Sequence, residues 1–220
     1  PPGIGKTALT KAVAHTSPVK DRFSDRRWFI ELDTAQSCDQ MQDAIVRALG
    51  GDPVRGLRAT LTAMAGPPGL LILDNLETPW DPLVERTATE DTLALVSESG
   101  LSLLASFRGR DRIGRPDWGL VHPVEKLTPE FAVKLFCDIS GHAVSDDPAL
   151  ASFMTALDGV PLAIELVAHR AFGEPDLHAV WQEWTRIGAA FAIRPGVKAS
   201  RLTSLAHSIE LSLQSSRLNE

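Results

Sequence analysis

The chain has 220 residues, of which 44% are hydrophobic and 23% are charged, and its formal net charge is −6. This composition is that of a globular protein, long enough for one large domain or two small ones. The acidic balance provides no basic surface for a phosphodiester backbone, so we expect no nucleic-acid contact. No apolar run reaches the roughly 20 residues of a membrane helix, so we expect no membrane contact. The two distant cysteines favour a reducing cytoplasm over a disulfide framework.

The opening stretch, PPGIGKT at residues 1–7, matches most of the phosphate-binding pattern G-x-x-x-x-G-K-[ST]. The first glycine of the pattern would precede Pro1, so we read the sequence as a piece cut inside the motif. Residues 6–15 continue with apolar side chains at helical spacing, and a glycine loop that leads into a helix binds phosphate through its backbone N–H groups. The alternative is a plain turn that caps a helix. The predicted phosphate-binding residues are Gly3, Ile4, Gly5, Lys6, Thr7 and Ala8.

Strands and helices alternate over residues 1–127, which predicts an α/β domain with a parallel sheet and helices on both faces. The runs at 70–77 and 101–107 are almost continuously apolar, as expected for strands buried on both sides. The strand that should precede the phosphate loop is absent from the sequence. The expected strands are 26–33, 70–77, 101–107 and 121–127, and the expected helices after the first are 41–50, 56–65 and 89–99.

From Thr128 onward the periodicity predicts helices only. The segment TPEFAVKLF places a capping hydroxyl before a proline at the first helical position, and DPALASFMTAL repeats this arrangement. Trp181 and Trp184 lie at helical spacing and are expected to pack in a core. We therefore predict a small helical subdomain at 128–195, followed by the start of a further domain at 196–220.

An acidic side chain ends the apolar strand that follows the predicted phosphate loop. Asp74 lies 67 residues after Thr7, where a carboxylate and a hydroxyl would together hold Mg²⁺ beside a nucleotide. Glu77 follows three residues later and is predicted to polarise the attacking water. The alternatives are a strand-ending aspartate that caps a turn and a solvated glutamate.

The strand expected at 101–107 is followed by Arg108, which a neighbouring strand would deliver to the γ-phosphate. A guanidinium there would make bidentate contacts and distinguish ATP from ADP. The alternative is an arginine in an ordinary charged surface loop. Lys6, Glu77 and Arg108 are the predicted catalytic residues, and Thr7 and Asp74 the predicted metal ligands.

With these motifs in order, the sequence resembles the nucleotide-binding module of STAND-class, NB-ARC-like signalling ATPases of the bacterial-regulator type. PPGIGKTAL is similar to their Walker A, LLILDNLE to their Walker B and LLASFRGR to their sensor strand. LDGVPLAIELVA is similar to their G-x-P motif, which implies that Gly159 and Pro161 bind the nucleotide, with Pro161 against the adenine. The resemblance further implies that 128–195 is an ARC1-like subdomain and that 196–220 begins a truncated winged helix.

The resemblance implies a Mg²⁺-dependent ATP/ADP-binding switch of a multidomain signal-transduction or transcription regulator. Asn75 occupies the place where relatives often carry a second acid, which implies slow hydrolysis at most. The implied partners are effector and sensor domains outside the sequence and a nucleotide-dependent homo-oligomer. Two alternatives stay open at this point: an ATPase motor or remodeller of the AAA+ type, and a degenerate phosphate loop that serves as an interaction scaffold.

Overall fold

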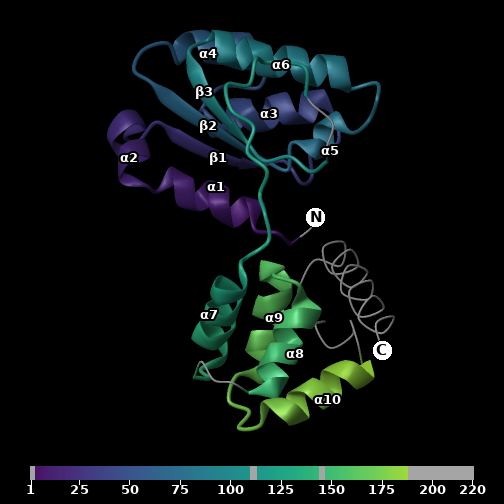
Figure 1. The fold of residues 1–220 in the computed structure, drawn as a ribbon. Coiled ribbons are helices and arrows are strands. Elements are labelled where there is room, and N and C mark those ends of the chain that lie inside the picture. Colours follow the sequence, from purple (N-terminus) through teal and green to yellow (C-terminus); the bar gives the residue numbers. More distant parts are fainter. Residues whose placement is uncertain (1–2, 110–112, 144–146, 188–220) are drawn as a thin grey trace. The chain divides into compact units, whose positions relative to one another are not determined.

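The structure is a computed structural model that describes residues 3–109, 113–143 and 147–187 (Figure 1). The chain divides into two compact units. Residues 6–122 form the α/β unit, and residues 1–5 together with 123–220 form the helical unit. The predicted domain limits after residues 127 and 195 stay predictions, and the predicted start of a winged helix at 196–220 lies outside the described residues.

The described part of the α/β unit contains a three-stranded parallel sheet in the order β1, β2, β3. The strands are β1 (Arg27–Glu31), β2 (Gly69–Asp74) and β3 (Leu101–Ala105). The central strand β2 pairs with both neighbours, with Asp74 opposite Glu31 and Leu73 opposite Ala105. The carboxyl ends of all three strands therefore meet at one edge of the sheet. The predicted mixture of helices with a parallel sheet is confirmed.

Helices cover both faces of this sheet (Figure 1). Leu70 and Ile72 of β2 point to the face covered by α1 and α2, whereas Leu71 and Leu73 point to the opposite face and pack with α3, α4 and α6. Because both faces are covered, every residue of β2 is buried, which explains its unbroken apolar sequence. The helices are α1 (Lys6–Ala14), α2 (Ser17–Phe23), α3 (Cys38–Ala48), α4 (Gly56–Ala63), α5 (Glu77–Trp80) and α6 (Arg86–Glu98).

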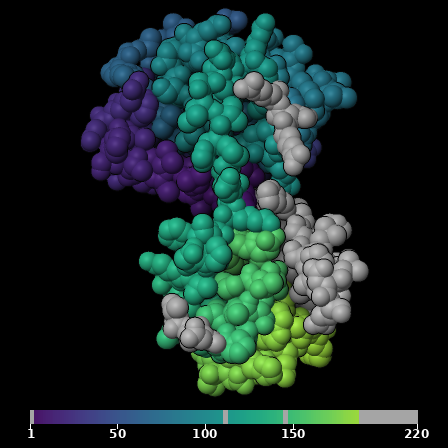
Figure 2. Space-filling view, viewed as in Figure 1, coloured from purple at the N-terminus to yellow at the C-terminus, as the bar shows by residue number. Residues whose placement is uncertain are grey.

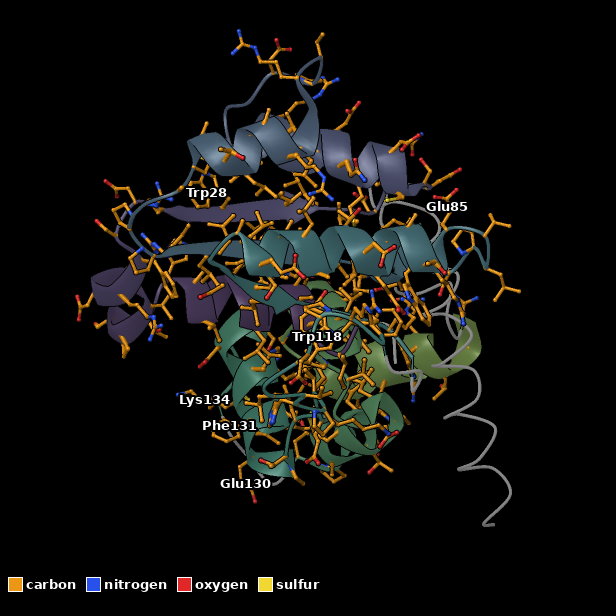
Figure 3. All side chains as sticks on the ribbon, turned by 90° about the horizontal axis from the view of Figure 1, so that it is seen from above. Trp28, Glu85, Trp118, Glu130, Phe131 and Lys134 are labelled. Atoms are coloured by element: carbon orange, nitrogen blue, oxygen red, sulfur yellow. The ribbon has the colours of Figure 1, made fainter. Side chains whose placement is uncertain are left out.

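Helices α3 and α6 are joined at their amino-terminal ends by a hydrogen bond across the layer. The backbone N–H of Cys38, at the start of α3, donates to Oε2 of Glu85 at 2.8 Å. Glu85 precedes the first residue of α6 and is labelled in Figure 3. Ser37 caps α3 by accepting a hydrogen bond from the N–H of Gln40. These bonds fix the start of the helical layer that covers the sheet face opposite α1.

The predicted strand at 121–127 is wrong, because the structure shows no strand in this segment. Pro123 has no backbone N–H to contribute to a ladder, and the side chain of Val121 is 61% exposed. The N–H of Leu127 bonds to the carbonyl of Gly159 at 2.9 Å, and not to a neighbouring strand. The segment is an extended connection whose far end is attached to the helical unit.

The described part of the helical unit contains α7 (Pro129–Ser140), α8 (Pro148–Leu157), α9 (Pro161–Ala171) and α10 (Leu177–Ile187). Their buried side chains form one core around Phe136, Phe153 and Trp184. Figure 2 shows the outer surface that these helices present, coloured from green to yellow along the chain. Trp181 contacts Phe153 edge to face, with ring centroids 5.0 Å apart. The prediction that Trp181 and Trp184 are packing residues is confirmed.

The first two helices of this unit begin differently, although both begin with a proline. Asp147 caps α8 by accepting a hydrogen bond from the N–H of Ala149 at 2.8 Å. Thr128 precedes α7 but makes no such bond to the helix backbone, so the predicted capping bond is absent. Its hydroxyl instead bonds the carboxylate of Glu130 and lowers the pKa of that group. The exposed face of α7 also carries Phe131 and Lys134 (Figure 3).

None of the described helices is both long enough and apolar enough to cross a membrane.

Candidate functional site

The predicted phosphate loop ends where α1 begins. Gly3 and Gly5 adopt left-handed backbone conformations, with φ of 75° and 92°, and Lys6 and Thr7 are the first two residues of α1. The first N–H groups of a helix have no partner inside it, and α1 carries no acidic side chain in its first turn. Ile4 is buried and Ala8 is exposed. The local backbone is therefore a glycine turn that leads into a helix with its positive end available to an anion.

The two predicted metal ligands are in direct contact. Asp74 is the last residue of β2 and is fully buried, and its Oδ2 accepts a hydrogen bond from the Thr7 hydroxyl at 2.6 Å. A carboxylate and a hydroxyl are the hard oxygen donors that Mg²⁺ prefers. Over the described ranges, no group of three or more His, Cys, Asp or Glu side chains is placed to hold a metal ion. A magnesium ion at Asp74 would thus take its remaining ligands from phosphate and water, as is usual beside a nucleotide.

A second hydroxyl contacts the same carboxylate, from a residue that the sequence analysis missed. Ser106 directly follows β3, is 5% exposed, and donates from Oγ to Oδ1 of Asp74 at 2.5 Å. The N–H of Asn75 donates to the Ser106 hydroxyl at 3.1 Å. The available signal was a small polar residue immediately after an apolar strand, at the sheet edge where β2 ends in Asp74.

Lys6 lies among the other charged residues predicted for the site. Partial burial lowers the pKa of its ammonium group. The Glu77 carboxylate opposes this change, the Arg108 guanidinium adds to it, and the Asp74 carboxylate opposes it more weakly. The fold therefore brings Asp74, Glu77 and Arg108 within electrostatic reach of Lys6, although the four residues come from three separate segments of the sequence.

Glu77 and Arg108 are linked through the backbone. Glu77 is the first residue of α5, and its Oε2 accepts a hydrogen bond from the N–H of Arg108 at 3.1 Å. Asn75, with φ of 60°, turns the chain between Asp74 and α5. The side chain of Arg108 is exposed. Glu77 thus holds the residue that carries the guanidinium, while its role as a catalytic base stays a prediction.

The helical unit contains the remaining predicted residues. Pro161 is the first residue of α9, and the N–H of Leu162 donates to the carbonyl of Gly3 at 3.2 Å. A Cβ atom on Gly5 would lie 3.8 Å from Cγ of Pro161. The glycine loop therefore rests against the start of α9. Gly159 has a packing role of its own, because a Cβ atom there would lie 2.5 Å from the carbonyl oxygen of Leu127.

Taken together, the carboxyl edge of the sheet and the start of α1 supply an ammonium group, two carboxylates and two hydroxyls. This donor set suits a phosphate that carries a divalent cation. The residues are Lys6, Asp74, Glu77, Thr7 and Ser106. A scan against protein-family models finds no family that matches the chain, and a search of curated proteins finds no matching relative.

Proposed function

We propose that this chain is a Mg²⁺-dependent ATP/ADP-binding switch module of a signal-transduction or transcription regulator, with slow ATP hydrolysis at most. The observation that carries the proposal is the 2.6 Å hydrogen bond between Thr7 and Asp74. It joins the first turn of a helix that follows a glycine loop to the acidic end of a buried strand. In phosphate-loop nucleotide sites, a hydroxyl at the start of the helix and a carboxylate at a strand end together hold the magnesium ion.

In this proposal the residues at the start of α1 bind the phosphates. The backbone N–H groups of the loop and the positive end of α1 receive the anion, and Lys6 adds a positive charge beside the β- and γ-phosphates. Thr7 and Asp74 hold Mg²⁺, which when bound would neutralise part of the phosphate charge. Burial lowers the pKa of Lys6, so a bound phosphate would raise that pKa again by supplying the opposite charge.

The proposed switch depends on residues that treat ATP and ADP differently. Arg108 contacts the γ-phosphate, which only ATP has, and Glu77 is the one carboxylate proposed to activate water. Pro161 offers the adenine an apolar ring without a donor, next to the turn at Gly159. A nucleotide shifts a conformational balance only through its different affinity for the two states. The contact with Arg108 supplies that difference in the proposal.

The direct test is calorimetric titration of ADP and ATP, in Mg²⁺, into the full-length protein and its Lys6→Ala variant. We expect the affinity to fall at least tenfold, a loss of about 1.4 kcal/mol or more of binding free energy. Lys11→Ala is the matched control, because Lys11 lies on the same helix and makes an exposed ion pair with Glu31. Unchanged affinity in Lys6→Ala would overturn the site assignment.

The same protein distinguishes the proposed switch from its rivals. Steady-state ATP turnover is expected well below about one per second. Turnover at or above this rate would favour a motor or remodeller. A wild-type protein that binds neither nucleotide would favour an interaction scaffold with a degenerate phosphate loop.

A further inference from the structure

Ser106 occupies the point where the ends of β2 and β3 are tied together. Its N–H donates to the carbonyl of Leu73 at 2.9 Å, and its carbonyl accepts from the N–H of Leu76 at 3.0 Å. These bonds extend the pairing of the two strands beyond the residues in regular register. Backbone hydrogen bonds alone therefore hold Ser106 to residues on both sides of Asp74.

The hydroxyl of Ser106 has only one arrangement that satisfies its neighbours. The N–H of Asn75 can only donate, so the hydroxyl oxygen accepts there at 3.1 Å. Its single proton is then available for Oδ1 of Asp74, which lies 2.5 Å away. With Oδ1 held by Ser106, Oδ2 is the oxygen that faces the Thr7 hydroxyl. The orientation of the carboxylate is thus defined from both sides.

Burial makes this orientation costly to lose. Asp74 has no exposed surface and Ser106 is 5% exposed, so water does not readily replace the serine hydroxyl. A buried carboxylate oxygen without a partner bears the full cost of desolvation. Removing the Ser106 hydroxyl would therefore favour rotation of the Asp74 carboxylate, and this rotation weakens a ligand for a divalent cation.

We propose that Ser106 is a positioning residue of the magnesium–nucleotide site, which holds the Asp74 carboxylate so that Oδ2 is presented beside Thr7. This inference rests on the proposed function. Ser106 would contribute to the gain in nucleotide affinity that Mg²⁺ provides, and it would do so by orienting Asp74. Because Arg108 follows only two residues later, the same strand end sets both the metal ligand and the arginine proposed to read the γ-phosphate.

The test is the affinity of the full-length protein for ADP, measured by calorimetry with Mg²⁺ and again with EDTA. Wild type is expected to bind more tightly with Mg²⁺. In Ser106→Ala the affinity in Mg²⁺ should fall roughly tenfold or more, the usual effect of removing an outer-shell partner of a metal ligand. The affinity in EDTA should change less than about twofold, because Ser106 does not touch the nucleotide in this proposal.

Two further variants and one control separate positioning from general structure. Ser106→Thr keeps the hydroxyl and should retain the Mg²⁺-dependent gain, whereas Ser106→Cys offers a weaker donor and should lose most of it. Ser102→Ala, on the same strand, should behave as wild type. In an Asp74→Asn background, Ser106→Ala should cause no further loss of affinity in Mg²⁺, since its partner carboxylate is gone.

The possible results contradict different parts of the two proposals. The role of Ser106 would be overturned if Ser106→Ala lost ADP affinity equally with Mg²⁺ and with EDTA. It would also be overturned if both Ser106→Ala and Ser106→Cys kept the Mg²⁺-dependent gain in ADP affinity. Neither result would contradict the proposed function. A wild-type protein that binds ADP equally well with Mg²⁺ and with EDTA would overturn the metal site and this inference, but not nucleotide binding. A wild type that binds no nucleotide would overturn the proposed function itself.

Discussion

Lys6 shows at the scale of one residue that the candidate site is not arranged for stability. Partial burial lowers the pKa of its ammonium group, and Arg108 contributes in the same direction. The folded chain therefore binds fewer protons at Lys6 than the unfolded chain does, in the pH range just below 10.5. Stability consequently rises with pH through that range, and the cost of burying the charge is fully present at neutral pH.

We predict that Lys6→Met raises the Tm of the nucleotide-free protein at pH 7, by an amount on the order of 1 °C. The methionine fills the same space and removes the desolvated charge. The difference from wild type should narrow as the pH approaches 10.5, because the partly buried amine of the folded wild type then loses its proton and with it the desolvation cost. Calorimetric melting at pH 7, 8.5 and 10 measures the effect.

Lys11→Met is the matched control for this prediction. Lys11 is exposed, pairs with Glu31 at 3.2 Å, and lies 4.8 Å from the centre of the Phe29 ring. Its removal should leave the Tm unchanged or slightly lower. A Tm for Lys6→Met that is clearly below wild type at every pH would contradict the assignment of a destabilising buried charge.

The turn between α8 and α9 shows at the scale of elements how a residue can match a motif and still have a separate structural cause. Asp158 and Gly159 both adopt left-handed conformations, with φ of 48° and 65°. The turn holds the end of the preceding connection, since Leu127 bonds to the Gly159 carbonyl and Lys126 forms an ion pair with Asp158. Gly159 is thus required by the approach of two backbones, whatever it contributes to a nucleotide site.

We predict that Gly159→Ala lowers the free energy of unfolding by roughly 2–4 kcal/mol, combining left-handed strain with overpacking against Leu127. Gly173→Ala is the matched control. Gly173 also has a positive φ, of 81°, but a Cβ atom there would meet nothing within 4 Å. Gly173→Ala should lower the free energy of unfolding by only about 1 kcal/mol. Urea unfolding followed by circular dichroism measures both, and equal costs would show that the Leu127 contact is not limiting.

Several elements, and the position of Asp74 at the end of a strand, were predictable because their signals are local. The helices after Thr128 show apolar spacing and proline starts, and Asp74 ends an apolar run at a workable distance from the loop. The contact between Ser106 and Asp74 was not predictable, because serine is also a common residue in ordinary turns that follow a strand. Its role depends on which strand lies beside it, which only the fold determines.

The incorrect strand at 121–127 has a different cause, because its side chains predict a strand that its backbone does not form. Val121 and Val124 are residues typical of a strand, but a strand needs a neighbour with free backbone groups. Pro123 supplies no donor, and Leu127 finds its acceptor in the turn at Gly159. The side-chain pattern does not show which backbone groups are close enough to form hydrogen bonds. The pattern predicts a strand at 121–127, but the available backbone partners do not allow one.

At the scale of the whole molecule, the division between the two compact units falls inside the predicted phosphate loop. Lys6, Thr7 and Asp74 belong to the α/β unit, whereas Gly5 and Pro161 belong to the helical unit. Gly5 and Lys6 are consecutive in the chain, so the predicted phosphate loop contains the division between the units. A ligand that binds this loop is therefore expected to protect amides in each unit.

Hydrogen exchange with mass spectrometry tests this expectation. At a free Mg-ADP concentration of about ten times Kd, exchange that requires nucleotide release should slow by roughly tenfold. We predict this slowing in peptides that cover residues 6–10, 73–77 and 159–164, and its absence in Lys6→Ala. Slowing confined to the α/β unit would remove Gly159 and Pro161 from the proposed site.

The hydrogen bonds from Thr7 and Ser106 to Asp74 join residues that are synthesised at different times. Thr7 leaves the ribosome 67 residues before its partner, and the residue that orients this partner follows 32 residues later. At roughly 5–20 residues per second, about 5–20 seconds pass between the first and last of the three. A nascent chain thus carries its glycine loop well before the loop has an acidic partner, so a nucleotide bound as proposed would stabilise only the completed sheet.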